Sequence, residues 1–132
     1  MKKFVILLFL AFISSLFLVQ AQSTTSPQKN LSIKPNFVLE DIVFAFNVMG
    51  TIEILGAEVE PFLECKNFLK GIIDKAQAEQ KKASDKITVE MPLVTAQNLS
   101  TFLSRGKFKG ENADNYKRLM DAMVEAAKSI PK

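Results

Sequence analysis

Histidine and tryptophan are absent from this sequence of 132 residues, and cysteine occurs only once. Without histidine, the chain can build neither a histidine-dependent catalytic triad nor a histidine-ligated metal centre. A single cysteine supports no zinc cluster and no internal disulfide framework. The sequence also has no glycine-rich phosphate loop, EF-hand calcium loop or nucleophile elbow. We therefore expect no enzymatic activity, no metal site and no cofactor.

The net charge of the chain is also small. Seventeen basic and fourteen acidic residues give a formal charge of +3. Lys2 and Lys3 lie in the N-terminal segment, and without them fifteen basic residues face fourteen acidic ones, for a formal charge of +1. A strongly basic chain would suggest a nucleic acid as partner. Because the basicity belongs mostly to the N-terminal segment, we expect no nucleic-acid partner.

The N-terminal segment is typical of a secretory signal peptide. Lys2 and Lys3 precede sixteen residues, Phe4 to Val19, that are apolar apart from two serines, and Ala21 completes a cleavage motif. Sixteen residues are fewer than the roughly 20 that span a bilayer, which argues against the alternative of an uncleaved membrane anchor. We predict a signal peptide at residues 1–21, a secreted, extracellular protein, and no stable membrane span after cleavage.

The chain changes character after residue 36. Residues 22–36 are rich in serine, threonine, glutamine and proline and contain two large apolar residues. Such a segment buries too little apolar surface to offset the entropy of ordering it. We therefore predict a flexible arm at residues 22–36, followed by one helical domain at residues 37–132.

The first part of that domain is unusually apolar. Fifteen of the twenty-three residues from Phe37 to Val59 are apolar. Four polar exceptions, Glu40, Asn47, Thr51 and Glu58, are spaced 7, 4 and 7 apart, which places them on a narrow arc of one helical face. The pattern predicts a helix. The alternative is a pair of strands joined by a turn at the glycine of this segment.

Three further helices are predicted from proline, glycine and apolar spacing. Pro61 begins the second helix, and the polar stretch 76–86 is interpreted as its exposed end. A short amphipathic helix spans 93–103 and is ended by Gly106, and the last helix spans 112–131. The predicted fold class is all-α, a small four-helix bundle-like domain.

A helix that is apolar nearly all round must be buried on several sides. Three short partner helices leave part of the first helix uncovered, and that surface would face a second subunit or a bound hydrophobic ligand. The alternative is a central core helix in a compact monomer. The predicted ligand-lining residues are Phe44, Phe46, Met49, Phe62, Phe68, Met120 and Met123.

A second candidate surface is the loop between the last two helices. Arg105, Lys107 and Lys109 surround Phe108 there. This pattern suggests an exposed basic and aromatic loop that docks an acidic surface, a sulfated glycan or lipid headgroups. The alternative is an ordinary loop whose phenylalanine folds back onto the core.

Cys65 is an unpaired thiol in a chain that we expect to enter an oxidising compartment. Its heptad position faces the apolar seam of the second helix, which favours burial as a small hydrophobic residue. The alternatives are an intermolecular disulfide across a homodimer and a reactive thiol.

Asn30 and Asn98 each begin an N-glycosylation sequon, which matters in a eukaryotic protein. The site at Asn30 is the more accessible because it lies in the predicted arm. A glycan at Asn98 requires that face of the third helix to be solvent-exposed.

These observations predict a secreted, non-enzymatic helical binding protein. It would carry a small hydrophobic, lipid-like ligand or dimerise through its apolar first helix. The alternative is an extracellular interaction or effector protein that acts through its polar helix faces and the basic loop 105–110.

Overall fold

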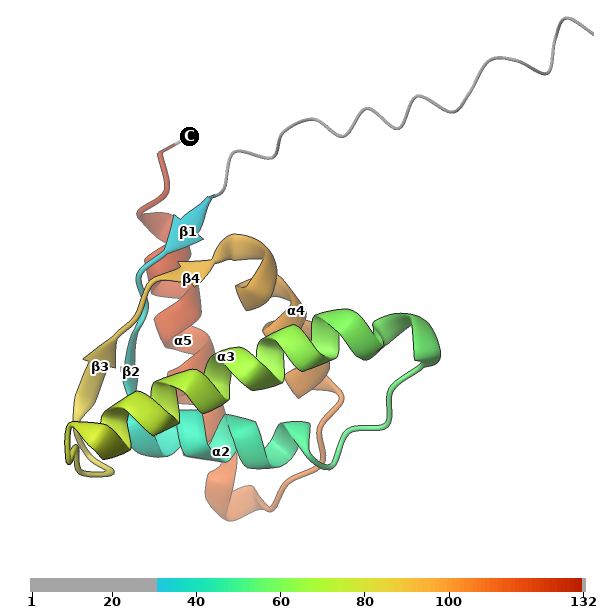
Figure 1. The fold of residues 1–132 in the computed structure, drawn as a ribbon, viewed down its shortest axis with the longest axis horizontal. Helices are drawn as coiled ribbons and strands as arrows, with labels where there is room; N and C mark the ends of the chain where they lie inside the picture. Colours follow the sequence, from blue (N-terminus) through green and yellow to red (C-terminus); the bar gives the residue numbers. More distant parts are fainter. Residues whose placement is uncertain (1–30, 132) are drawn as a thin grey trace, which may run out of the picture.

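The computed structural model describes residues 31–131, and 64% of these residues are helical. Four α-helices, two short 3-10 helices and four short strands make up this range (Figure 1). The helices are α2 (Leu39–Met49), η1 (Gly56–Glu58), α3 (Val59–Ala78), α4 (Leu93–Ser104), η2 (Gly110–Asn112) and α5 (Ala113–Lys128). The predicted all-α class and helix count are confirmed. The predicted signal peptide at 1–21 lies outside the described residues.

The short strands form one antiparallel ribbon. They are β1 (Ser32–Ile33), β2 (Asn36–Val38), β3 (Lys86–Thr88) and β4 (Met91–Pro92). β1 pairs with β4 and β2 pairs with β3. The register does not shift between the two pairs, since Ile33 lies opposite Met91 and Phe37 lies opposite Ile87. The ribbon therefore ties the segment before α2 to the segment before α4.

The end of the predicted arm belongs to the folded domain. Ile33 is only 2% exposed, and Pro35 is also buried. Leu31, Ile33, Pro35 and Phe37 alternate with polar residues, which is the period of a strand with one buried face. The average composition of the segment hides this alternation, and residues 31–36 belong to the domain that we expected to begin at Phe37. Residues 22–30, the rest of the predicted arm, lie outside the described residues.

α2 is shorter than the helix predicted at 37–59. It ends before Gly50, and residues 50–55 form an irregular connection to η1. The β-branched Ile52 and Ile54 in this connection pack against the core instead of continuing the helix. The strand pair weighed for this segment is also wrong, because the residues before Gly50 are helical.

α3 begins two residues before Pro61, which lies in the first turn, where its missing N–H costs no helical hydrogen bond. The stretch 76–86, predicted as the exposed end of this helix, contains instead its last three residues, a reversal of the chain and the start of β3. Gln80 has a φ of 54°, and the N–H of Lys81 donates to the carbonyl of Ala76 at 2.9 Å. This is the hydrogen bond of a Schellman motif, which ends a helix.

α4 and α5 agree closely with the sequence. The helices predicted at 93–103 and 112–131 are found at 93–104 and 113–128. Gly106 and Pro131 lie just beyond their ends, where such residues stop helices.

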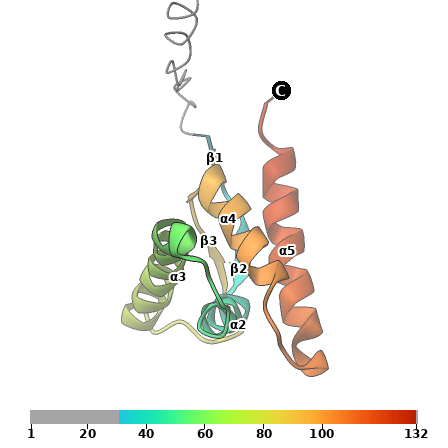
Figure 2. The same cartoon turned by 90° about the vertical axis from the view of Figure 1, so that its right-hand side faces the viewer.

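α2 lies at the centre of the domain and contacts α3, α4 and α5. Figure 2 shows α3 and α5 on opposite sides, with α4 and the ribbon between them. α5 also contacts β1 and β2, so that it covers one side of the ribbon. The largest fully buried apolar side chains include Phe37, Ile42, Met49, Leu69, Met91, Leu99, Leu103 and Leu119.

Candidate binding groove

The predicted ligand-lining residues do not gather around one cavity. Four of them, Phe44, Met49, Phe62 and Met123, are buried in the core, and the other three, Phe46, Phe68 and Met120, pack against it. Seven of the eleven residues of α2 are buried among the neighbouring helices. The chain itself therefore covers α2, as in the core-helix alternative, and the surface that we expected to need a partner is not on this helix.

A groove of about 600 Å³ lies between α3 and the strand β3. Its walls are the C-terminal part of α3, from residue 67 to 79, Lys81, and the extended residues 86–90. Phe68, Ile72, Ile87 and Val89 line it and also contact the core, so they supply an apolar floor. Of the predicted ligand-lining residues, only Phe68 borders this groove.

Gly71 lies in the α3 wall of the groove. A Cβ added there would meet no atom within 4 Å, so the wall has open space at this point. The residue is in regular helix with a negative φ, so the backbone does not require glycine here. A larger side chain at residue 71 can therefore extend into the groove without a backbone change.

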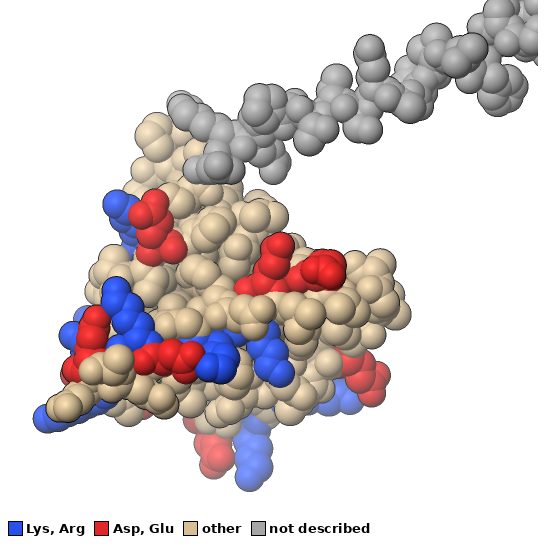
Figure 3. Space-filling model, viewed as in Figure 1, with Lys and Arg blue, Asp and Glu red and all other residues tan. Residues whose placement is uncertain are grey.

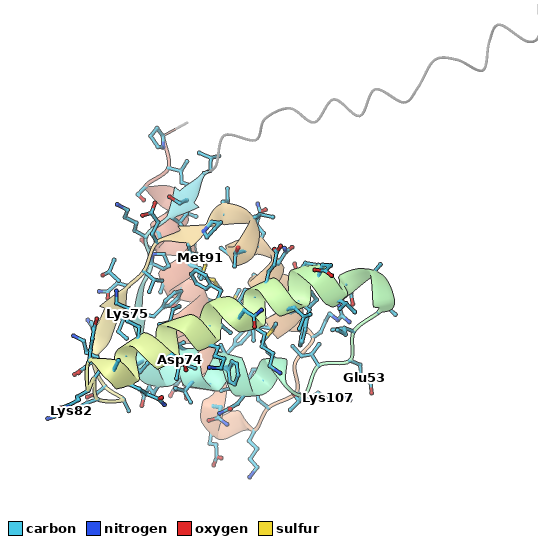
Figure 4. All side chains as sticks on the ribbon, in the orientation of Figure 1. Glu53, Asp74, Lys75, Lys82, Met91 and Lys107 are labelled. Carbon is cyan, nitrogen blue, oxygen red and sulfur yellow. The ribbon has the colours of Figure 1, made fainter. Side chains whose placement is uncertain are left out.

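Charged side chains surround the apolar floor. The carboxylate of Glu79 lies 4.0 Å from the Nζ atoms of both Lys75 and Lys81, so two ammonium groups share one carboxylate. Glu90 accepts a hydrogen bond of 2.8 Å from the hydroxyl of Ser32. Lys86 makes no ion pair with the described residues. Lys75 lies beside β3 in Figure 4, and acidic and basic side chains intermingle across this face in Figure 3.

A second polar feature, between α2 and α5, was not predicted from the sequence. Asp41 in α2 is only 1% exposed. Its carboxylate accepts hydrogen bonds from Nε of Arg118 at 3.0 Å, from a terminal nitrogen of Arg118 at 2.7 Å, and from the amide of Asn115 at 2.8 Å. Arg118 also pairs with the exposed Glu40 at 2.6 Å. These contacts raise the pKa of Arg118, with the Asp41 hydrogen bonds as the largest cause.

The position of Asp41 could have been inferred. It precedes the apolar Ala45 by four residues and Val48 by seven, so a helix places it on the buried face. Since its carboxylate is fully hydrogen-bonded within the chain, we assign it to holding α5 against α2.

The loop 105–110 is tied to the rest of the domain. The guanidinium of Arg105 pairs with Glu58 at 2.6 Å, and this hydrogen bond lowers the pKa of the Glu58 carboxyl. The ring of Phe108 lies 5.2 Å from the rings of both Phe44 and Tyr116, and the side chain is 36% exposed. Phe108 folds back, as in the second interpretation of this loop. Lys107 and Lys109 remain the exposed cations of the predicted interaction loop.

Cys65 is fully buried on the core side of α3, and its sulfur lies 3.7 Å from the carbonyl oxygen of Thr95. Burial, with a smaller contribution from Glu64, raises the pKa of the thiol to about 11. This placement fits the small hydrophobic residue and gives a second chain no access to the sulfur. Asn98 is half-buried on α4, and Asn30 lies outside the described residues.

Comparisons with protein-family models, with curated proteins and with solved structures found no match for this chain. Among the helices of residues 31–131, none has both the length and the apolar character needed to cross a membrane. The same part of the chain contains no cluster of three side chains suited to holding a metal ion.

Proposed function

We propose that this protein is a secreted, non-enzymatic binding protein whose ligand lies in the groove between α3 and β3. The observation that supports this proposal is the groove of about 600 Å³ with an apolar floor and a charged rim. Sites for small ligands commonly measure about 300–1,000 Å³ and combine apolar walls with a few polar groups. The ligand would have apolar groups that cover this floor, in keeping with the hydrophobic ligand expected from the sequence.

The groove suits binding because its apolar residues are only partly covered by the chain. Ile87 and Val89 keep part of their surface accessible at the floor, as does Phe68. An apolar ligand that covers them gains about 25 cal/mol for each Å² of apolar surface removed from water. The lysines at the rim can hold a polar or anionic group of the same ligand.

The alternative function, docking through the basic loop, has less support. One of its three cations, Arg105, is already paired with Glu58, and its aromatic residue packs on Phe44 and Tyr116. We therefore favour the groove.

Uptake of two fluorescent probes by the purified protein tests the proposal. The probes are 8-anilinonaphthalene-1-sulfonate, which reports accessible apolar surface, and a dansyl-labelled undecanoic acid, which represents a lipid-like ligand. We expect both to bind. Gly71→Leu should weaken binding at least tenfold, because the leucine fills open space in the wall of the groove.

Gly110→Leu is the matched control. A Cβ at Gly110 also meets no atom within 4 Å, and this residue lies in η2, away from the groove. It should leave both affinities unchanged. The proposal fails if the unmodified protein binds neither probe, or if the two leucine variants bind equally well.

A further inference from the structure

Within residues 31–131, the ribbon has a free edge. Hydrogen bonds across it are made by the odd-numbered residues: Val89 N–H donates to Pro35 carbonyl at 3.1 Å, and Leu39 N–H donates to Asp85 carbonyl at 3.0 Å. In an antiparallel pair the residues between bonded positions direct their N–H and C=O groups away from the partner strand. The backbone groups of Lys86, Thr88 and Glu90 therefore point outward. Each sheet has two strands in the described part of the chain, so no third strand covers this edge there.

The free edge borders the groove. Residues 86–90 all line it, and α3 forms the facing wall. Side chains alternate along a strand, and Ile87 and Val89 turn toward the core while Lys86 and Thr88 are exposed. The groove thus offers an apolar floor beside a row of backbone donors and acceptors. The opposite edge of the ribbon, by contrast, lies against α5.

This arrangement discriminates between ligand classes. An acyl chain in the groove would keep water from the backbone groups of Lys86 and Thr88 without replacing their hydrogen bonds. Each buried group left unpaired costs about 1–3 kcal/mol. An extended peptide offers those groups partners and still places alternate side chains on the apolar floor, as in other cases of strand addition.

We propose that the ligand of this groove is an extended peptide, which adds as a third strand to the outer edge of β3 and carries an acidic side chain near Lys86. This inference rests on the proposed function, since it names the ligand class of the same groove. The charge of the rim supports an acidic partner, because it contains three lysines (Lys75, Lys81 and Lys86) and two glutamates (Glu79 and Glu90). Of these lysines, Lys86 makes no ion pair with the described residues.

The length of the edge sets the length of the peptide. From residue 86 to residue 90 an extended strand covers about 13 Å, at about 3.3 Å per residue. This span pairs with about five residues of a peptide. Pro92 lies at an outward position beyond the edge, where it has no N–H to offer, so strand addition should stop before it.

Peptides displayed as random octamers are selected on the purified full-length protein, and the enriched peptides are synthesised with a fluorescein label. We expect apolar residues at alternate positions and an acidic residue at one end. Two N-methylated versions of one enriched peptide follow, each methylated at every second amide and differing in parity. Fluorescence polarisation should show at least a tenfold weaker affinity for one parity and less than a twofold change for the other.

Variants of the protein locate the bound peptide. Gly71→Leu should weaken peptide binding at least tenfold, and Lys86→Glu should weaken it several-fold. Lys82→Glu is the matched control, because Lys82 lies in the turn and points away from the domain (Figure 4). Thr88→Pro removes an outward N–H that β2 does not use, and it should weaken binding if circular dichroism shows an intact fold.

The remaining outcomes separate the two proposals. Uptake of the dansyl-labelled acid without any enriched peptide, or equal losses for both methylated parities, overturns the strand addition and leaves the groove as a binding site. No uptake of either kind overturns both. Hydrogen exchange adds a direct test: slow exchange at the Lys86 and Thr88 amides of the free protein would mean that residues 22–30 or a second copy already covers the edge, which also overturns the proposal.

Discussion

The contact around Asp41 and the groove beside β3 both place charged side chains next to apolar ones. They differ in whether the chain itself satisfies the polar groups and covers the apolar surface. At Asp41, Arg118 and Asn115 satisfy the buried carboxylate completely within the chain. At the groove, the outer edge of β3 pairs with no other strand of the described chain, and the floor keeps accessible apolar surface. Polar groups that the chain satisfies serve its stability, whereas those that it leaves open are available to a ligand.

The two faces of α3 repeat this contrast within one helix. Cys65 lies on the face turned to the core and is fully buried. Gly71 lies on the face turned to the groove, where space is open. Substitutions on the closed side should therefore lower stability without changing ligand binding, and bulky substitutions on the open side should weaken ligand binding without lowering stability.

Asp41→Ala should produce a large loss of stability. It removes three hydrogen bonds to a buried carboxylate, and breaking a buried ionic contact costs about 3–5 kcal/mol in the free energy of unfolding, measurable by urea denaturation. We expect a value near the lower limit, because the remaining arginine is half-exposed and can be rehydrated. Probe affinity in the groove should not change under native conditions.

Arg118→Ala should lower the free energy of unfolding more than Asp41→Ala does, because it leaves the buried carboxylate without a cation. Arg105→Ala, which removes exposed contacts with the Glu58 carboxylate and the Glu53 carbonyl, is the control and should change stability far less. Equal losses for all three variants would contradict the closed, buried character that we assign to the Asp41 contact.

The Cys65 thiol should make stability depend on alkaline pH. Its pKa is raised to about 11 in the folded protein, from an ordinary value near 9.0. Between these two pH values the unfolded chain has lost the thiol proton and the folded chain still holds it. Ionisation of the thiol therefore stabilises the unfolded state, and the free energy of unfolding falls as pH rises. The full loss is about 2–3 kcal/mol, reached near pH 11.

Urea denaturation at pH 8 and at pH 10.5, compared between the unmodified protein and Cys65→Ala, isolates the contribution of the thiol. The difference in stability between the two proteins should shift with pH in favour of the variant. A difference that is independent of pH would mean that the thiol titrates as freely in the folded protein as in the unfolded chain.

Gly106→Ala should lower the free energy of unfolding by less than the substitutions at Asp41 and Arg118. A Cβ at Gly106 would overlap Cγ1 of the buried Val48 and press on the carbonyl oxygen of Leu103 at 3.2 Å. Forcing extra volume into a packed contact costs about 1–3 kcal/mol. Thermal denaturation should show a lower midpoint, and Val48→Ala in the same chain should recover part of the loss by giving the added methyl group room.

Local signals explain why α4 and α5 were predicted well. Both helices have amphipathic spacing and a glycine or proline just beyond the end, and these features need no distant partner. The ribbon was missed because its strands have two or three residues each and exist only through pairing between residues about 55 apart in the chain. No single strand is long enough for its alternation of apolar and polar residues to predict it.

The same reason limits the prediction of the site. Phe68 was named as a ligand-lining residue from its size and chemistry, but the groove around it arises where α3 passes β3, and that placement is tertiary. Phe44, Met49 and Phe62 share its chemistry and are buried in the core instead. The burial of Asp41, by contrast, could have been predicted, because its position in the helix alone places it on the same face as buried residues.

Gly71→Ala should have the smallest effect on stability and the opposite sign. Glycine in a helix interior is about 0.5–1 kcal/mol less favourable than alanine, and here the added methyl group meets no atom within 4 Å. The free energy of unfolding should therefore rise by about that amount, while the single methyl group leaves probe affinity nearly intact. The same substitution thus stabilises the open side of the molecule and destabilises the closed side at Gly106. A loss of stability at Gly71 would show that the wall of the groove is closed in solution, and the binding argument would lose its basis.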